Sequence, residues 1–442
     1  GASLGSGISS FRTGGAGTTL NIGEKCAVFP QDGLAGGADN DNDGLGELAE
    51  RAIGTSDNSS DSDNDGISDL SEIQQGLDAL GGRGFPNGVI ASVQTLGSAN
   101  VVVVTGTNVN PSQLLAYVAT GSHGLATIDV SQFTNPIILG QLDLEGDAVD
   151  VDVDPISQIA VVAAGTGQTH FVDVSDPVLP SRIRTVATQS TQVEIVDGVA
   201  YVAAGTRLVA YEVLTGELLN VFDIPGATVP TTSMTHDGNM LYTMESDRNL
   251  RSIQVNNGRF TSRGSLLLPQ GGGKISIAGD VLYAAALPSY GRGGFVTVDI
   301  TNPQSMLLIS GSDVVSPFVG PGTAVVANGS GLAMLLGNPN GTNIVDLMNV
   351  RDPLNTNALV TRFNLPAAPK SAAIASGIGY IADGTGGLQV VNYVGFDNQR
   401  QAPTVAITGA AGTTAQEGIL FPVRVQVTDD VQVRNVELLV NN

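Results

Sequence analysis

The densest group of chemically capable side chains in this 442-residue sequence is a run of eleven carboxylates between residues 39 and 72. A single cationic side chain, Arg51, interrupts the run. Without counterions, so many negative charges at such short spacing disfavour a compact state. Carboxylate oxygens are the ligands that hard divalent cations prefer, so the chemistry indicated is metal binding.

The spacing of these carboxylates repeats a twelve-residue calcium-loop pattern twice, at residues 39–50 and 61–72. Each copy has acidic residues at positions 1, 3 and 5, glycine at 6, a backbone carbonyl ligand at 7 and a chelating glutamate at 12. The alternative for a charge run is a solvated acidic linker, which two complete matches disfavour. We predict Ca²⁺ as the cofactor, bound by Asp39, Asp41, Asp43, Leu45, Glu47 and Glu50 in the first loop and by Asp61, Asp63, Asp65, Ile67, Asp69 and Glu72 in the second.

The chain around these loops excludes the long flanking helices of an EF-hand, because Gly, Thr, Ser and Asn residues separate the two sites. Short helical turns are expected only at residues 48–53 and 70–75. The paired loops, the Gly-Thr-Ser-Asp step at residues 54–57 and the Gly-Leu-Asp run at residues 76–78 resemble the thrombospondin type 3 repeats of bacterial surface proteins. The resemblance implies a calcium-stiffened spacer outside the cell. Ser56 departs from the family pattern, so no ligand role is assigned to Asp57.

The elements that follow are short strands in a repeat. Seven times between residues 115 and 392, an apolar strand leads through a turn to a second strand that carries a polar acceptor near its end, with a period of roughly 40–50 residues. The first strands begin at Tyr117, Val161, Tyr201, Tyr242, Tyr283, Met334 and Tyr380, and the acceptors are Asp129, Asp173, Glu212, Gln254, Asp299, Asp346 and Asn392. Four short strands per unit at this period predict an all-β fold with a seven-bladed β-propeller. The acidic acceptors are expected to hydrogen-bond neighbouring backbone groups.

These units resemble the LVIVD repeat, a bacterial propeller repeat, through residues 124–131 and 170–177. The resemblance covers residues 115–197 and returns at residues 296–303 and 387–393. It implies a propeller at the cell surface and no defined reaction.

The seventh unit is short, so we expect it to be completed from the start of the chain. Strands at residues 89–96 and 100–105 would pair with those at residues 378–382 and 388–393. This arrangement closes the ring from both ends and avoids an exposed sheet edge.

Strands are also expected at residues 402–408, 421–428 and 436–440, and this stretch resembles the opening half of a bacterial immunoglobulin-like domain. A complete sandwich needs about 100 residues, so we expect the chain to continue or another molecule to supply strands. The predicted organisation is a Gly-rich end of an upstream β segment (residues 1–38), a calcium-binding spacer (39–84), the propeller (85–399) and the partial immunoglobulin-like domain (400–442).

The net charge of −23, from 19 basic and 42 acidic side chains, argues against nucleic acid and anionic membrane surfaces as partners. No apolar run reaches the length of a membrane span, so direct membrane insertion is not expected. Cys26 has no second cysteine to pair with. The expected partners are calcium ions together with other surface proteins, glycans or copies of the chain itself, at an extracellular or cell-surface location.

No catalytic constellation emerges from the sequence, since His123, His170 and His236 fall at different places within their repeats. The main hypothesis is a non-enzymatic calcium-binding surface protein whose spacer orients a propeller interaction module, with assembly into a surface layer or fibre as an extension. One alternative is an adhesin or receptor that binds a glycan or protein through the propeller face. Another is a secreted hydrolase that uses the carboxylates crowded at residues 147–154.

Overall fold

The computed structural model describes residues 37–63, 68–70, 73, 79–80, 88–106, 113–165, 167–287, 294–310, 322–329, 331–375, 377–393, 404–407 and 425–428. Two compact units are present. One contains the described residues up to Leu80 and the other spans Gly88–Tyr393. Across the part of the chain that the structure describes, no helix has both the length and the apolar character needed to cross a bilayer.

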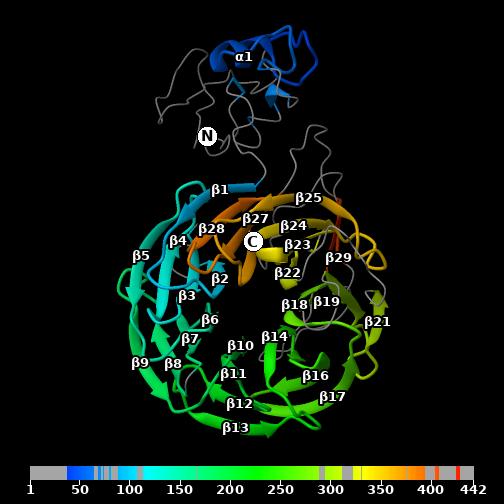
Figure 1. Ribbon diagram of the computed structural model, residues 1–442. Helices are drawn as coiled ribbons and strands as arrows, with labels where there is room; N and C mark the ends of the chain where they lie inside the picture. Colours follow the sequence, from blue (N-terminus) through cyan, green and yellow to red (C-terminus); the bar gives the residue numbers. More distant parts are fainter. Residues whose placement is uncertain are drawn as a thin grey trace. The chain divides into compact units, whose positions relative to one another are not determined.

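The second unit is a β-propeller of seven four-stranded antiparallel sheets arranged in a ring (Figure 1). Blade 1 contains β2 (Val101–Gly106), β3 (Leu114–Ala119), β4 (Leu125–Asp129) and β5 (Ile137–Leu142). Blade 2 contains β6 (Asp150–Asp154), β7 (Ile159–Ala163), β8 (Thr169–Asp173) and β9 (Ser181–Val186). Blade 3 contains β10 (Gln192–Val196), β11 (Val199–Ala204), β12 (Arg207–Glu212) and β13 (Leu218–Asp223).

The next three blades repeat this order from the centre outward. Blade 4 contains β14 (Thr231–Asp237), β15 (Met240–Glu245), β16 (Asn249–Asn256) and β17 (Arg259–Leu267). Blade 5 contains β18 (Gly272–Ala278), β19 (Val281–Ala286), β20 (Phe295–Asp299) and β21 (Leu307–Ser310). Blade 6 contains β22 (Gly322–Ala327), β23 (Leu332–Gly337), the 3₁₀ turn η3 (Pro339–Gly341), β24 (Ile344–Asn349) and β25 (Leu359–Asn364).

Blade 7 closes the ring by joining the two ends of the propeller sequence. Its inner three strands are β26 (Ser371–Ala375), β27 (Ile378–Ala382) and β28 (Leu388–Asn392), and its outer strand is β1 (Gly88–Val93). Closure from both ends was predicted correctly, but the expected participation of residues 100–105 is wrong. That segment is β2, the inner strand of blade 1, where it pairs with β3 from Val101↔Ala119 to Gly106↔Leu114. One returning strand is enough, because blade 7 lacks only its outer strand.

The apolar core lies between neighbouring blades, because both faces of each blade are covered. On β3, Leu115 and Tyr117 pack with blade 2 residues, whereas Ala116 and Val118 pack with blade 7 residues. This is the two-residue alternation of a strand, with both sides buried. It explains why the second strand of each blade is apolar almost throughout.

The ends of the third strands hold tight turns. The carboxylates of Asp129, Asp173 and Asp299 each accept a hydrogen bond from the backbone N–H two residues further on, all at 2.9 Å. These aspartates therefore bond the backbone of their own turns. In blade 6 this role belongs to Asn349, which bonds the N–H of Arg351 at 3.1 Å. The assignment of Asp346 to this position is wrong by three residues, and Asp346 instead pairs with Arg362.

The third strands also bond the next blade. Thr127 Oγ1 donates to the carbonyl oxygen of Pro177, and Thr297 Oγ1 donates to that of Pro353 at 2.7 Å. These prolines lie in the Asp-Pro corners of blades 2 and 6. The motif that marks the repeat in the sequence therefore also connects consecutive blades.

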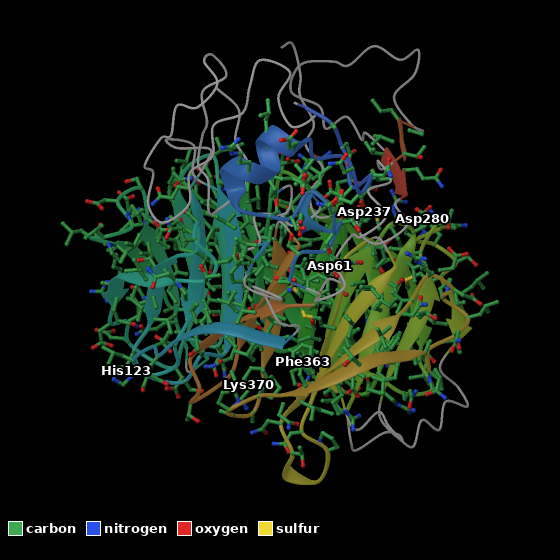
Figure 2. All side chains as sticks on the ribbon, turned by 90° about the horizontal axis from the view of Figure 1, so that it is seen from above. Asp61, His123, Asp237, Asp280, Phe363 and Lys370 are labelled. Atoms are coloured by element: carbon green, nitrogen blue, oxygen red, sulfur yellow. The ribbon has the colours of Figure 1, made fainter. Side chains whose placement is uncertain are left out.

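The turns after the inner strands gather on one face of the propeller. Asp237 and Asp280 lie on this face, whereas His123 and Lys370 lie on the opposite face (Figure 2). In the chain after the propeller, β29 (Thr404–Ile407) and β30 (Val425–Thr428) pair into a two-stranded sheet. The third strand predicted there, at residues 436–440, and the upstream segment at residues 1–36 lie outside the described residues.

Candidate metal centre

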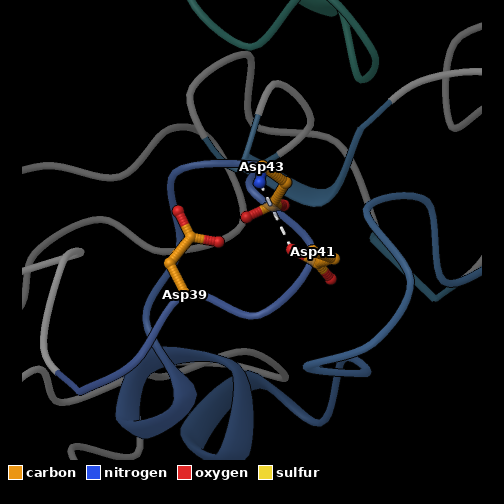
Figure 3. Close-up of side chains that lie close together, drawn as sticks. All are labelled: Asp39, Asp41 and Asp43. Carbon is orange, nitrogen blue, oxygen red and sulfur yellow. Dashed lines mark hydrogen bonds between the residues drawn. The ribbon is translucent and has the colours of Figure 1, made fainter.

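The first predicted calcium loop brings its three leading carboxylates together. One carboxylate oxygen from each of Asp39, Asp41 and Asp43 lies within 4.8 Å of the others, and the three side chains converge on one point (Figure 3). Two oxygens bound to the same Ca²⁺ at about 2.3–2.6 Å are at most about 5 Å apart. The spacing of these oxygens therefore fits a single calcium ion.

The loop backbone has the bend that the sequence pattern requires. Gly44 has φ of +94°, a conformation in which a side chain would be strained, and Asn42 has φ of +61°. Backbone N–H groups also point into the loop: that of Asp43 donates to Asp41 Oδ1 at 3.2 Å, and that of Gly44 donates to Asp39 Oδ2 at 3.1 Å. These bonds hold the carboxylates in a converging arrangement.

The closing glutamate is supplied by α1 (Glu47–Ile53), a helix of two turns. The helix ends at Gly54, which has φ of +99° and whose N–H bonds the Glu50 carbonyl at 2.6 Å. Glu47, at loop position 9, is exposed at the first residue of the helix, whereas the Glu50 side chain is 1% exposed. Because α1 begins at position 9, its first turn carries position 12 into the interior of the unit.

Glu50 is a buried carboxyl group with no hydrogen-bond partner on either oxygen. Burial, and then the charges of Asp41 and Asp43, raise its pKa to about 7. Asp57 and Asp69 add smaller effects in the same direction. A buried acid surrounded by acids is unfavourable unless a cation accompanies it.

The second loop is described only in part. Asp61 and Asp63 are half-buried and Asp69 is fully buried, whereas Asp65, Ile67 and Glu72 lie outside the described residues. Asp69 Oδ1 accepts the N–H of Ser62 at 2.8 Å, and Asp69 Oδ2 accepts the hydroxyl of Ser62 at 2.7 Å. Burial raises the pKa of Asp69 even though these two bonds oppose the shift.

The two loops contact each other. Asp43 Oδ1 accepts the N–H of Leu45 at 2.6 Å, and Asp43 Oδ2 accepts the N–H of Leu70 at 3.3 Å. Leu45, Ala49 and Leu70 are all buried, as is Ile73. The inward orientation of Leu45, which leaves loop position 7 to contribute only its carbonyl, agrees with the sequence pattern. The contact between Asp43 and Leu70 had no signal in the sequence.

The histidines lie apart from one another in the propeller. His123 lies in the β3–β4 turn, where its Nδ1 is 3.1 Å from Ser122 Oγ. His170 is buried and bonds Thr185 and the carbonyl of Glu145. His123 and His170 thus each have partners of their own in their blades.

Two of the carboxylates crowded at residues 147–154 connect blade 2 to blade 3. Asp150 and Asp152 accept backbone N–H bonds from β10, at 2.9 Å from Val193 and 2.7 Å from Ile195. Asp154 accepts bonds from Ser157 in its own turn. The sequence did not show these roles. In other blades, serine side chains accept the equivalent backbone hydrogen bonds.

The LVIVD repeat model matches residues 109–143 and 273–313. The propeller carries LVIVD repeats. The first match covers β3, β4 and β5 of blade 1, and the second covers blade 5 from β18 to β21. The other stretches expected to resemble the repeat, around residues 170–177 and 387–393, are not among the residues matched.

Solved structures with a likeness to this chain include BamB from Moraxella catarrhalis, at 14% sequence identity and a TM-score of 0.46, covering 66% of this chain and 86% of that one. The computationally designed Ika8 protein has 10% identity and a TM-score of 0.48, with 69% of this chain and 99% of that one covered. A search of curated protein sequences finds no match.

Proposed function

We propose that this chain is a non-enzymatic calcium-binding protein of the cell exterior, in which Ca²⁺ stiffens residues 39–72 and the propeller acts as an interaction module. The observation that supports calcium binding best is Glu50, a buried carboxylate without a partner that faces the charges of Asp41 and Asp43. A divalent cation would compensate this charge, and side-chain hydrogen bonds would not.

The residues that would hold the ion in the first loop are Asp39, Asp41, Asp43 and Glu50, together with the carbonyl of Leu45. Their donors are hard oxygens, which suit calcium better than metals that prefer nitrogen or sulfur. The ion would supply positive charge and no redox chemistry. Modules of this kind outside cells bind calcium at about 10⁻⁴–10⁻³ M, so the site would fill outside the cell and stay empty in the cytoplasm.

The propeller supports the second half of the proposal. Its LVIVD repeats build a closed ring with a rigid scaffold and exposed turns, an arrangement typical of protein-interaction modules. The partners we propose are other surface proteins, glycans or further copies of the chain. Hydrolysis by the carboxylates of blade 2 is disfavoured, because Asp150 and Asp152 are already engaged with β10.

The test is calorimetric titration with Ca²⁺, combined with limited proteolysis near Gly54. The parent chain should bind calcium in the millimolar range and resist cleavage at Gly54 when calcium is present. The Asp41→Ala/Asp63→Ala variant should bind more weakly and be cut in both conditions. The control Asp176→Ala/Asp352→Ala removes the same charge from two propeller corners and should behave like the parent. Equal cutting of the parent with and without calcium would overturn the proposal.

A further inference from the structure

Side-chain oxygens join the inner strands of neighbouring blades in a repeated way. Ser371 Oγ accepts the N–H of Val102 at 3.1 Å, and Ser233 Oγ accepts that of Ile275 at 3.1 Å. In blade 2 the same repeat position is Asp150, whose Oδ2 accepts the N–H of Val193. The equivalence follows from the register, since Asp150 pairs with Ala163 as Ser371 pairs with Ala382.

A second position of the repeat, two residues further along the inner strand than Asp150, also has serine in another blade and aspartate in blade 2. In blade 5, Ser276 Oγ accepts the N–H of Ala327 at 3.3 Å, whereas in blade 2 Asp152 Oδ2 accepts the N–H of Ile195. A serine hydroxyl fills this position without charge. Blade 2 instead places two carboxyl groups against β10, where Asp150 is only 7% exposed. Neither hydrogen bond requires a charge, so what the two acids add, and serine lacks, is a group that can gain or lose a proton.

The charged groups that face these acids come from three further inner strands. On β10, Glu194 acts on Asp152 as a like charge, and Glu194 Oε2 lies 2.9 Å from His236 Nδ1 on β14. On β18, Lys274 Nζ lies 3.9 Å from Asp150 Oδ1. Asp237, beside His236 on β14, adds a further negative charge.

The remaining neighbours contribute little charge. The strands that flank β6, namely β2 and β7, carry no titratable side chain. Behind β10 and β14 lie Tyr201 and Tyr242, and Glu245 on β15 is paired with Arg251. We name this group of charged side chains the inner seam; its members are Asp150, Asp152, Glu194, His236 and Lys274. The inner seam is thus largely separated from other charges of the described propeller.

Both acids of blade 2 bind protons more readily than usual. Burial raises the pKa of Asp150 to about 6, although Lys274 opposes the shift. Burial, and then the charge of Glu194, raise the pKa of Asp152 to about 8. Burial lowers the pKa of His236, but its bond with Glu194 and the nearby acids outweigh burial and raise it.

We propose that the inner seam is a proton-linked closure of the propeller: blades 2, 3 and 4 hold together most tightly when Asp150, Asp152 and His236 retain their protons, and they loosen when those protons are lost. All three shifted groups act with the same sign. A group with a raised pKa in the folded state adds stability at low pH and loses it as pH rises through that value. The seam should therefore weaken progressively between about pH 4 and pH 8.

The experiment measures amide hydrogen exchange at Val193 and Ile195 in the full chain at constant calcium, at pH 5.5 and pH 8, after correction for intrinsic rates. In the parent, opening at these amides should increase by roughly tenfold at the higher pH. In Asp152→Asn the amide oxygen still accepts the Ile195 N–H without charge, so the increase should become clearly smaller. The matched control Asp154→Asn, on the same strand, should retain it.

A second variant protects the test against a folding failure. Glu194→Gln removes the like charge that opposes Asp152 and keeps an acceptor for His236, so it should reduce the increase as well. Equal pH dependence in the parent and in both variants would overturn the proposal. So would a parent whose exchange at Val193 and Ile195 does not change with pH.

Discussion

Asp43 Oδ2 accepts the backbone N–H of Leu70, 27 residues further along the chain, at 3.3 Å. The same residue's other carboxylate oxygen bonds Leu45, inside its own loop. Asp43 therefore connects the two acidic loops, because any change in its position alters both. The adjacent Asp69 also responds to the charge of Asp43.

The first prediction concerns this connection. Asp43→Ala should weaken calcium binding at the first loop and also increase hydrogen exchange at the Leu70 amide, since that N–H loses its acceptor. Asp39→Ala removes the same charge from the same loop, and Asp39 makes no hydrogen bond to the described residues of the second loop. This variant should therefore weaken calcium binding and leave the Leu70 amide protected. Similar exchange in the two variants would show that the loops are independent.

The second prediction concerns Glu50, whose negative charge should destabilise the calcium-loop unit without calcium and stabilise it when calcium is bound. In the presence of a chelator, Glu50→Gln should raise the melting temperature of the calcium-loop unit, because it removes a buried charge that repels Asp41 and Asp43. In millimolar calcium the order should reverse, since the variant lacks the closing ligand. Thermal denaturation with and without calcium measures both effects. A variant less stable than the parent in both conditions would contradict this explanation.

The third prediction tests the inner seam by exchanging residues between blades. Asp150→Ser, which copies Ser233 and Ser371, should raise the free energy of unfolding at pH 8 by roughly 1–3 kcal/mol. The sign follows from the folded pKa of about 6, above the usual value, so that Asp150 stabilises the fold at low pH and loses this effect as pH rises. At pH 4 the variant should show no such gain.

The reciprocal substitution is the matched control. Ser371→Asp places a buried carboxyl group beside Val102, at a position that is 4% exposed. Its cost should grow with pH. Denaturant unfolding at several pH values separates this pattern from a loss of packing, which would be the same at each pH.

The fourth prediction concerns the bonds between blades at the Asp-Pro corners. Thr127→Val and Thr297→Val keep the side-chain shape but leave the carbonyls of Pro177 and Pro353 without these donors. Each should lower the free energy of unfolding by about 1–2 kcal/mol, at all pH values. The two sites lie in different blades, so the double variant should show the sum. Thr261→Val, at an exposed position of the outer strand β17 of blade 4, is a control for the substitution itself.

The seven repeats could be recognised from the sequence because one strand of every blade is buried on both faces, as in β3 and β27. The assignment of each strand to a blade could not be predicted, since the alternation of side chains along a strand does not indicate which sheet the strand joins. Residues 100–105 were therefore assigned to the wrong blade. Likewise, Asp346 and Asn349 both follow an apolar run, and only the pairing Leu332↔Asn349 distinguishes them.

For the metal centre, Asp39, Asp41 and Asp43 converge as their local spacing in the sequence predicted, whereas Glu47, which was also assigned as a ligand, is exposed. The sequence pattern could not predict the burial of Glu50, which depends on the packing of α1, or the contact between Asp43 and Leu70. In the propeller, the acids at residues 150 and 152 were considered only as part of a crowded group of carboxylates that a hydrolase could use. Only alignment of the blades in space shows that serine occupies the same positions elsewhere.

The closure of blade 7 by β1 also determines how the ring would respond to mechanical tension. Gly88, where the chain enters the propeller, pairs with Asn392, where it leaves, and the pairing then continues inward to Val93↔Leu388. A force that separates residues 87 and 393 would pull the two strands apart from that end and break their hydrogen bonds one pair at a time. Such peeling needs less force than shearing all the pairs together. Blade 7 is therefore the place where a stretched chain would open first.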